Sequence, residues 1–335
     1  MIALNESKMR LEMKRLLAAF AVLVLMGPTI AEDRRPFLVL FVAGPDTHGW
    51  GAHDHNPSTA VLSESLQDAM GKSVQIKVAW SEWPTEADFA KADVCVIYSD
   101  GWSRSVLKGK ERMEQIEEFM NAGKGVLRIH WATGSDPADN ERHRKLFGGN
   151  MESDYSVHST IWNQKFSLAE HPITRGMKPF ELVDECYFHM HWVDENKSGI
   201  VDILSAKPAQ NFLSRSITPK ARESLQRNEP QTIAWAYERP QGGRAFSYTG
   251  GHFHWDWAND NARKMILNAI VWSGQREVPK QGLSSTRPTA ERLLELMAER
   301  GKKTNPDWTA EALQPLLDKL NQPGGKIDWR RPSFE

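Results

Sequence analysis

Hydrophobic runs and amphipathic segments alternate along the first half of the chain. Continuous apolar runs, which are typical of strands buried on both faces, predict strands at residues 36–43, 74–80, 92–98 and 125–130. Helical periodicity between these runs predicts helices at residues 56–70, 86–91 and 108–121. This alternation of strands and helices argues for an α/β fold with a parallel sheet and right-handed crossovers.

The second half of the chain is less regular. Residues 231–237 and 244–248 have the pattern of a hairpin, and residues 259–272 predict a helix that closes the domain. Two further helical patterns, residues 289–299 and 309–320, follow a linker-like stretch. We interpret them as an appendage packed on the core or as a contact for a partner.

The first 31 residues have the layout of a cleavable leader. A basic start precedes an apolar run from Leu16 to Met26, which is too short to span a membrane, and small residues precede Glu32. An uncleaved anchor is the alternative. We predict a signal peptide at residues 1–31, a core domain at 32–276, and a linker with a C-terminal helical extension at 277–335. The mature protein is then periplasmic or secreted.

Composition narrows the class of protein only slightly. The chain is 40% hydrophobic and 25% charged, with a net charge of −1, which is ordinary for a soluble globular protein. No basic patch suggests nucleic acid. Thirteen tryptophans offer surfaces on which sugars stack, although a large core also uses tryptophan. Cys95 lies in an apolar run and is expected to be buried, and with Cys186 it makes no disulfide framework.

Polar residues gather where the predicted strands end. His48 follows the first strand, Asp100 the third and His130 the fourth, and His252 follows the strand that precedes the last helix of the domain. Because the carboxyl ends of parallel strands share one edge of a sheet, we expect these four side chains to converge.

The histidines also form three H-x-H pairs, namely His53/His55, His189/His191 and His252/His254. In extended chain the two rings of such a pair point the same way. Imidazoles beside carboxylates suit either a transition metal or acid–base chemistry. The alternative is that the histidines bond to the backbone and to Asp256. The sequence lacks the G-x-S-x-G, Walker, G-x-G-x-x-G and H-E-x-x-H motifs.

Four ordered segments resemble the ThuA-like (trehalose utilisation) family. They are GVLRIHWATG, EHPITRGM, DECYF and GGRAFSYTGGH with the later ARKMILNAIVW, and the resemblance covers about residues 37–275. It implies the class I glutamine amidotransferase-like fold, which is a flavodoxin-like open and mostly parallel sheet with helices on both faces. Amidotransferases of that fold carry a cysteine nucleophile at an elbow after a strand, whereas here that position is His130. The late histidine of their site corresponds to the pair His252 and His254. Cysteine-based chemistry is therefore not expected.

The resemblance links the chain to disaccharide breakdown, including 3-keto sugars. We expect an exported lyase or hydrolase of glycosides or 3-keto-glycosides, or alternatively a non-catalytic sugar-binding or scaffold protein. The expected catalytic residues are His130, His252 and Glu185, with Asp184 as another choice of carboxylate. The expected metal ligands are His130, His252 and His254. The expected substrate-binding residues are His48, Asp100, Trp131, His254, Trp255 and Trp257.

The expected cofactor is a divalent transition metal (Zn, Mn or Fe), or none. The expected partner is a sugar substrate, with no nucleic acid and no membrane after cleavage of the leader. The sequence leaves a homo-oligomer open.

Overall fold

The computed structural model describes residues 35–158, 161–215 and 217–322. The predicted signal peptide lies outside these ranges. From residue 37 onward, the described residues form one compact unit. Within the described part of the chain, none of the helices combines the length and the apolar character that a membrane crossing requires.

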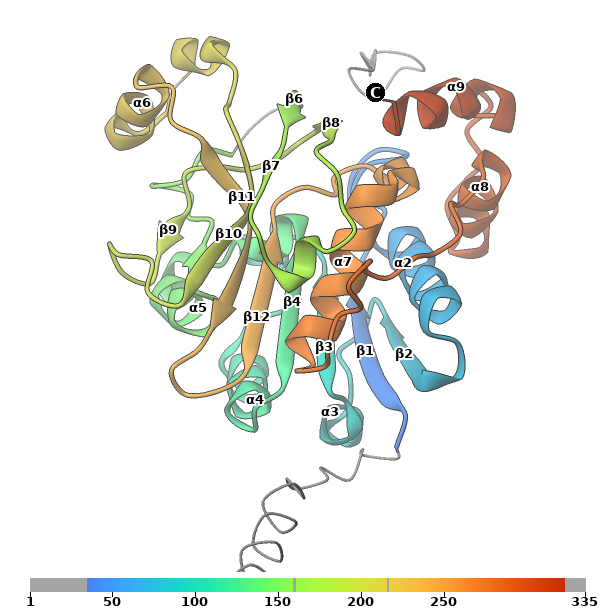
Figure 1. Ribbon diagram of the computed structural model, residues 1–335, viewed down its shortest axis with the longest axis horizontal. Coiled ribbons are helices and arrows are strands. Elements are labelled where there is room, and N and C mark those ends of the chain that lie inside the picture. The colour runs from blue at the N-terminus through green and yellow to red at the C-terminus, as the bar shows by residue number, and fades with distance from the viewer. Residues whose placement is uncertain (1–34, 159–160, 216, 323–335) are drawn as a thin grey trace, which may run out of the picture. The chain divides into compact units, whose positions relative to one another are not determined.

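An eight-stranded sheet forms the centre of this unit, in the order β2-β1-β3-β4-β12-β11-β10-β7 (Figure 1). The first five strands in this order run parallel to one another. They are β2 (Val74–Trp80), β1 (Phe37–Ala43), β3 (Val94–Tyr98), β4 (Gly125–Ile129) and β12 (Arg244–Tyr248). The last three pair antiparallel, and they are β11 (Gln231–Glu238), β10 (Ile200–Ala206) and β7 (Ser167–Leu168). The predicted fold class, an open and mostly parallel sheet, is confirmed.

Helices cover both faces of the sheet because successive residues of its strands point to opposite sides. In β1, Val39 and Phe41 join a core with α2 and α7, whereas Leu40 and Val42 join a core with α3, α4 and α5. The helices are α2 (His55–Met70), α3 (Glu86–Lys91), α4 (Lys110–Asn121), α5 (Asn140–Phe147), α6 (Pro219–Gln226), α7 (Asp260–Ser273), α8 (Ala290–Glu299) and α9 (Ala310–Leu320).

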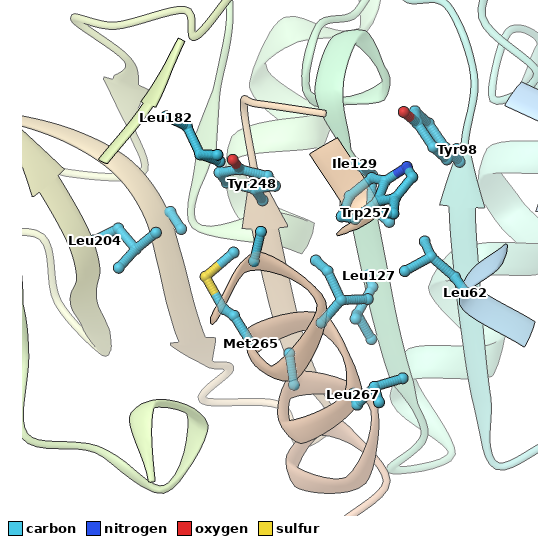
Figure 2. Close-up of a cluster of buried hydrophobic side chains, with 14 of the residues drawn as sticks. Leu62, Tyr98, Leu127, Ile129, Leu182, Leu204, Tyr248, Trp257, Met265 and Leu267 are labelled. Carbon is cyan, nitrogen blue, oxygen red and sulfur yellow. The ribbon is translucent and has the colours of Figure 1, made fainter. Parts of the chain in front are cut away.

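The core beneath α7 holds large apolar side chains from several elements (Figure 2). Met265 and Leu267 of α7 pack with Ile129 at the end of β4. Trp257 lies in the same cluster and is 0% exposed, and Trp255 is 3% exposed. A tryptophan buried in this way contributes area to folding rather than to a ligand surface.

Shorter strands surround the sheet in the irregular region of the sequence. They are β5 (Gly149–Asn150), β6 (Trp162–Lys165), β8 (Glu181–Asp184) and β9 (His191–Trp192), with β5 paired to β9 and β6 to β8. The strand β6 is four residues long. Cys95 and Cys186 are buried, and they are not joined in a disulfide.

The two C-terminal helices pack on the core. Leu293 and Leu296 of α8 and Leu313 and Leu317 of α9 belong to the same hydrophobic cluster as α2 and α7. In Figure 1 α8 lies beside α2, and α9 lies next to α8.

Candidate active site

Four side chains from four loops meet at the carboxyl ends of the parallel strands. We call them the histidine cluster, and its members are His53, His130, Glu185 and His252. One ligand atom from each lies within 4.8 Å of the others. His53 comes from the loop after β1, His130 directly follows β4, Glu185 follows β8 and His252 follows β12.

The backbone turns sharply at two members of the cluster. His130 has φ 58° and His53 has φ 47°, and both are buried. Left-handed backbone is uncommon for residues other than glycine, and it is concentrated at functional sites because the surrounding structure must hold it in place. At His130 the chain passes from β4 into a 3₁₀ turn, Trp131 included, so this position forms the expected elbow.

Hydrogen bonds at the outer nitrogens fix the tautomers of His130 and His53. The carbonyl of Thr249 can only accept, so Nδ1 of His130, 2.9 Å away, donates to it. The carboxylate of Asp100 likewise accepts from Nδ1 of His53 at 2.6 Å. In each neutral ring the proton is therefore on Nδ1, and Nε2 carries a lone pair. The two Nε2 atoms face one another at 3.1 Å.

Electrostatics keep both rings neutral. Burial lowers the pKa of His130 well below its ordinary value, and the neighbouring His53 and His252 lower it further. The pKa of His53 is lowered by burial and then by His252. Two lone pairs at 3.1 Å repel each other unless a cation lies between them, so this arrangement fits a metal ion.

The other distances within the histidine cluster also fit a bound metal ion. Nδ1 of His252 lies 3.2 Å from Nε2 of His130 and 3.0 Å from Oε2 of Glu185. Glu185 lies 3.7 Å from Nε2 of His130. Ligands about 2.0–2.1 Å from a tetrahedral ion are separated by about 3.3 Å. The bond from His53 to Asp100 also reproduces the carboxylate–histidine pair that orients metal ligands.

Two loops place His53 and His252 side by side. An antiparallel bridge joins Ala52 to Phe253. The amide of His53 donates to the carbonyl of His252 at 3.0 Å, and the amide of His254 donates to the carbonyl of Gly51 at 2.9 Å. The loop before α2 and the loop after β12 are therefore held together by backbone hydrogen bonds.

Asp184 fixes the other side of the second loop. Its carboxylate accepts from the amides of Gly251 at 2.5 Å, Glu185 at 2.7 Å and His252 at 3.1 Å. Gly251 has φ 93°, and a side chain there would also meet Trp257. Asp184 is thus not a member of the cluster but positions two of its members. Burial and the adjacent Asp184 raise the pKa of Asp256 well above its ordinary value, so Asp256 carries the proton of this buried pair.

Aromatic rings surround the cluster. The hydroxyl of Tyr187 lies 3.1 Å from Nε2 of His130 and 3.3 Å from Oε2 of Glu185. Burial raises the pKa of Tyr187 well above its ordinary value, so the phenol stays protonated. His48 is exposed and stacks on His53, with the ring centres 3.6 Å apart. The ring of Trp131 lies 5.7 Å from that of His53.

A polar cavity adjoins this site. His158 stacks on Tyr187 with the ring centres 5.0 Å apart, and its ring is 5.8 Å from that of Trp131. The same histidine lines a cavity of about 500 Å³ whose other polar residues include Ser153, Ser156, Arg215 and Thr218. A small polar ligand that occupies this cavity would therefore lie next to the residues that contact the cluster.

The structure brings together six of the residues expected from the sequence and separates three from them. Those that meet are His48, Asp100, His130, Trp131, Glu185 and His252. His254 instead donates from Nε2 to the carbonyl of Leu293 at 3.1 Å and accepts from Ser58 at 3.1 Å. It is not a ligand beside His252, because the chain enters a 3₁₀ turn at this residue. Trp255 and Trp257 are core residues and present no stacking surface.

Sequence reasoning missed three residues of the site. His53 was counted only as one of a pair, although its place in the loop after a strand, like that of His48, is the signal that identifies it. Tyr187 lies in the segment DECYF, in which the acidic residues are the stronger signal of a catalytic role. No motif in the sequence identifies His158 as a site residue. The pair His189/His191 lies outside the cluster, because His189 stacks on Tyr155 and His191 pairs with Glu152 at 2.8 Å.

Comparisons with known proteins agree with this fold. A model of the ThuA family, described as trehalose utilisation, matches residues 39–273. A ThuA-like protein from Parabacteroides merdae has 16% identity and a TM-score of 0.50, over 76% of this chain and 98% of its own. Another from Bacteroides uniformis has 15% identity and a TM-score of 0.51, over 74% and 95%. A search of curated proteins gave no match.

Proposed function

The chain belongs to the ThuA family, whose description is trehalose utilisation, and from that premise we propose that it is an exported, metal-assisted enzyme of carbohydrate breakdown. Membership in this family connects the chain with carbohydrates. The observation that carries the metal proposal is the pair of Nε2 lone pairs of His53 and His130, which face each other at 3.1 Å. A divalent cation at this point would replace their repulsion by two coordinate bonds.

The histidine cluster supplies three imidazoles and one carboxylate as ligands. This set suits Zn²⁺, and it also suits Mn²⁺ or Fe²⁺ where water or substrate oxygens complete the shell. Asp100 and the carbonyl of Thr249 would orient His53 and His130 from outside. If Glu185 exchanges with substrate, the three histidines retain the ion, as in catalytic zinc sites.

The substrate class we propose is a glycoside oxidised to a ketone at C3. The ketone acidifies the neighbouring C2–H bond. A base takes the C2 proton, the C–H electron pair forms the C1=C2 double bond, and the glycosidic C1–O bond breaks with its electron pair on the leaving oxygen. That oxygen takes up a proton. Negative charge develops on the C3 oxygen in the transition state, where an adjacent cation stabilises it most.

His48 and Tyr187 are the residues we propose for proton transfer. His48 is exposed at the mouth of the site, so it can exchange a proton with solvent while its ring stays stacked on His53. Burial lowers the pKa of His48, and Asp100 opposes that effect, so the ring is available as a base at neutral pH. Tyr187 keeps its proton and can donate it to an oxygen beside His130.

Substrate binding would use the polar cavity beside His158. Its hydroxyl and guanidinium groups match the hydroxyls of a sugar ring, and Trp131 with His158 offers aromatic surface beside it. A second ring of a disaccharide would extend into this cavity while the reacting ring contacts the cluster.

The experiment is a turnover assay on the mature chain, purified without a histidine tag. It is treated with a chelator, reloaded with Zn²⁺, Mn²⁺ or Fe²⁺, and incubated with trehalose or 3-keto-trehalose. We expect release of free glucose from the 3-keto substrate, only after metal is restored. Binding of the sugar without turnover under every metal would contradict the enzyme and support a sugar-binding protein. Mass spectrometry of the protein from the native host tests export, for which we expect an N-terminus near Glu32.

A further inference from the structure

The C-terminal segment after α7 reaches the same two loops that carry the cluster. The family match ends at residue 273, and α8 and α9 lie beyond it. Three contacts from this segment fall on residues that lie within three positions of His53 or His252 in the sequence. These contacts involve Lys302, Trp308 and the carbonyl of Leu293.

Lys302 forms an ion pair with Asp54, the residue between His53 and His55. Asp54 is fully buried, and its second oxygen accepts from the amide of Gly51 at 2.8 Å. A buried carboxylate without its partner is costly, so loss of Lys302 would release the turn at residues 51–54.

Trp308 packs against both loops at once. Its ring stacks on Trp255, with the ring centres 4.7 Å apart and the planes 16° apart. It also contacts Trp50 at 4.9 Å, two residues after His48. Trp308 is 4% exposed, so this three-ring stack is part of the core rather than a surface contact.

The third contact passes through His254. Its ring joins Ser58 in α2 to the carbonyl of Leu293 in α8. The C-terminal segment therefore touches the first loop through Lys302 and the second loop through Leu293, while Trp308 touches both. Because the loops are also bonded to each other, an anchor at these points restrains His53 and His252 together.

We propose that the C-terminal extension is a positioning element of the active site, in which Lys302 and Trp308 hold the two loops so that His53 and His252 face His130. The inference rests on the proposed metal site for its functional readout. Lys302 and Trp308 do not contact the cluster, so in this proposal they act indirectly, by holding the loops that carry His53 and His252.

The test compares Lys302→Met with Lys303→Met, its exposed neighbour, in the full mature chain. One readout is the Zn²⁺ affinity by competition with a chromogenic chelator. The other is hydrogen exchange of the metal-free protein at residues 48–55 and 250–254, with the amides of β1 and β4 as internal controls. We expect Lys302→Met to weaken zinc binding at least about tenfold, the size of effect seen for groups that orient ligands, and to speed exchange only in the two loops. Lys303→Met should match the wild type.

Two further variants separate positioning from folding. Lys302→Arg keeps the positive charge, so zinc affinity and loop exchange should both return to the wild-type level. If Trp308→Ala fails to fold, Trp308→Phe takes its place and should change both readouts to an intermediate degree. Unchanged loop exchange in Lys302→Met would overturn the inference even if the wild type binds zinc. Faster exchange throughout the chain would also overturn it, because the role would then be general stability. A wild type that binds no metal would refute the proposed metal site. Hydrogen exchange in the two loops would still decide whether the C-terminal extension holds them in place.

Discussion

Two H-x-H pairs lie side by side in this structure, and each sends one ring into the cluster and one away from it. In the loop before α2, His53 joins the cluster while Nδ1 of His55 donates to the carbonyl of Pro45 at 2.8 Å. In the loop after β12, His252 joins the cluster while His254 bonds to Leu293 and Ser58. Nitrogens of His53 and His252 lie 3.1 and 3.2 Å from Nε2 of His130. In contrast, Nδ1 of His55 and both ring nitrogens of His254 bond to uncharged partners.

The difference comes from the backbone rather than from the residue type. Two histidines separated by one residue share a face only if the chain is extended through both. Here His53 has φ 47° and His55 begins α2. In the other pair the chain is extended at Phe253 and then turns into a 3₁₀ helix at His254. In each of these two pairs, the local turn therefore decides which of the two rings joins the cluster.

The largest effect should follow loss of a cluster member. We expect His53→Ala or His130→Ala to weaken metal binding by more than about 100-fold, because a ligand should matter more than a group that only orients one. Circular dichroism should stay at the wild-type level. Zinc competition on both variants checks this, and a wild-type affinity in either would remove that residue from the site.

Asp100→Asn should have the next largest effect. An amide does not provide the negative charge that orients Nδ1 of His53, so metal affinity should fall about 10- to 100-fold. Asp136→Asn is the matched control, since that carboxylate pairs with Lys108 at 3.2 Å away from the cluster. Equal affinities for the two variants would show that Asp100 only packs against His53.

His254→Asn should change stability rather than metal binding. Loss of the bonds to Leu293 and Ser58 should lower the free energy of unfolding by about 1–3 kcal/mol. Urea unfolding at pH 7 measures this, and zinc affinity should remain within about threefold of the wild type if the metal contacts are unchanged. A large loss of affinity with normal stability would restore His254 as a ligand.

The pKa of His254 predicts how the stability of the protein depends on pH. Burial lowers the pKa of His254 to about 4, below the value of about 6.5 in the unfolded chain. Between these values the unfolded state binds a proton that the native state does not, so stability falls as pH drops, by up to about 3 kcal/mol for this group. The difference in stability between wild type and His254→Asn should therefore shrink from pH 7 to pH 4.5. A constant difference over that range would mean that His254 titrates normally.

His48→Ala should have the smallest effect on metal binding. His48 is exposed and stacks outside His53, so we expect zinc affinity within about threefold of the wild type. The turnover number should fall by about 10²- to 10⁴-fold if His48 transfers the proton. Steady-state kinetics on the 3-keto substrate checks the second part, and unchanged turnover would assign the base to another residue.

The sequence predicted the parts of the site that depend on regular structure. Apolar runs identified β1, β3, β4 and β12, and their shared edge predicted that His48, Asp100, His130 and His252 converge. The same pattern placed His130 at the elbow. These inferences succeed because burial and alternation are properties of neighbouring residues in the chain.

The remaining parts depend on how loops fold back, which local patterns do not encode. The role of His53 follows from its left-handed turn and from the Ala52–Phe253 bridge, a contact between residues far apart in the sequence. Trp255 and Trp257 were expected to stack on a sugar because tryptophan serves both cores and sugar sites. Only the packing of Trp308 and of α7 shows that these two rings are covered.

The most direct test of the central claim is the metal content of three proteins, the wild type, His53→Ala and His55→Asn. Each is purified without a histidine tag, loaded with Zn²⁺, freed of excess ion and measured by elemental analysis. We predict about one zinc per chain in the wild type and in His55→Asn. We predict almost none in His53→Ala, because a loss of affinity of more than about 100-fold should let the ion be removed together with the excess metal. The same metal content in His53→Ala as in the wild type, or none in any of them, would contradict the account.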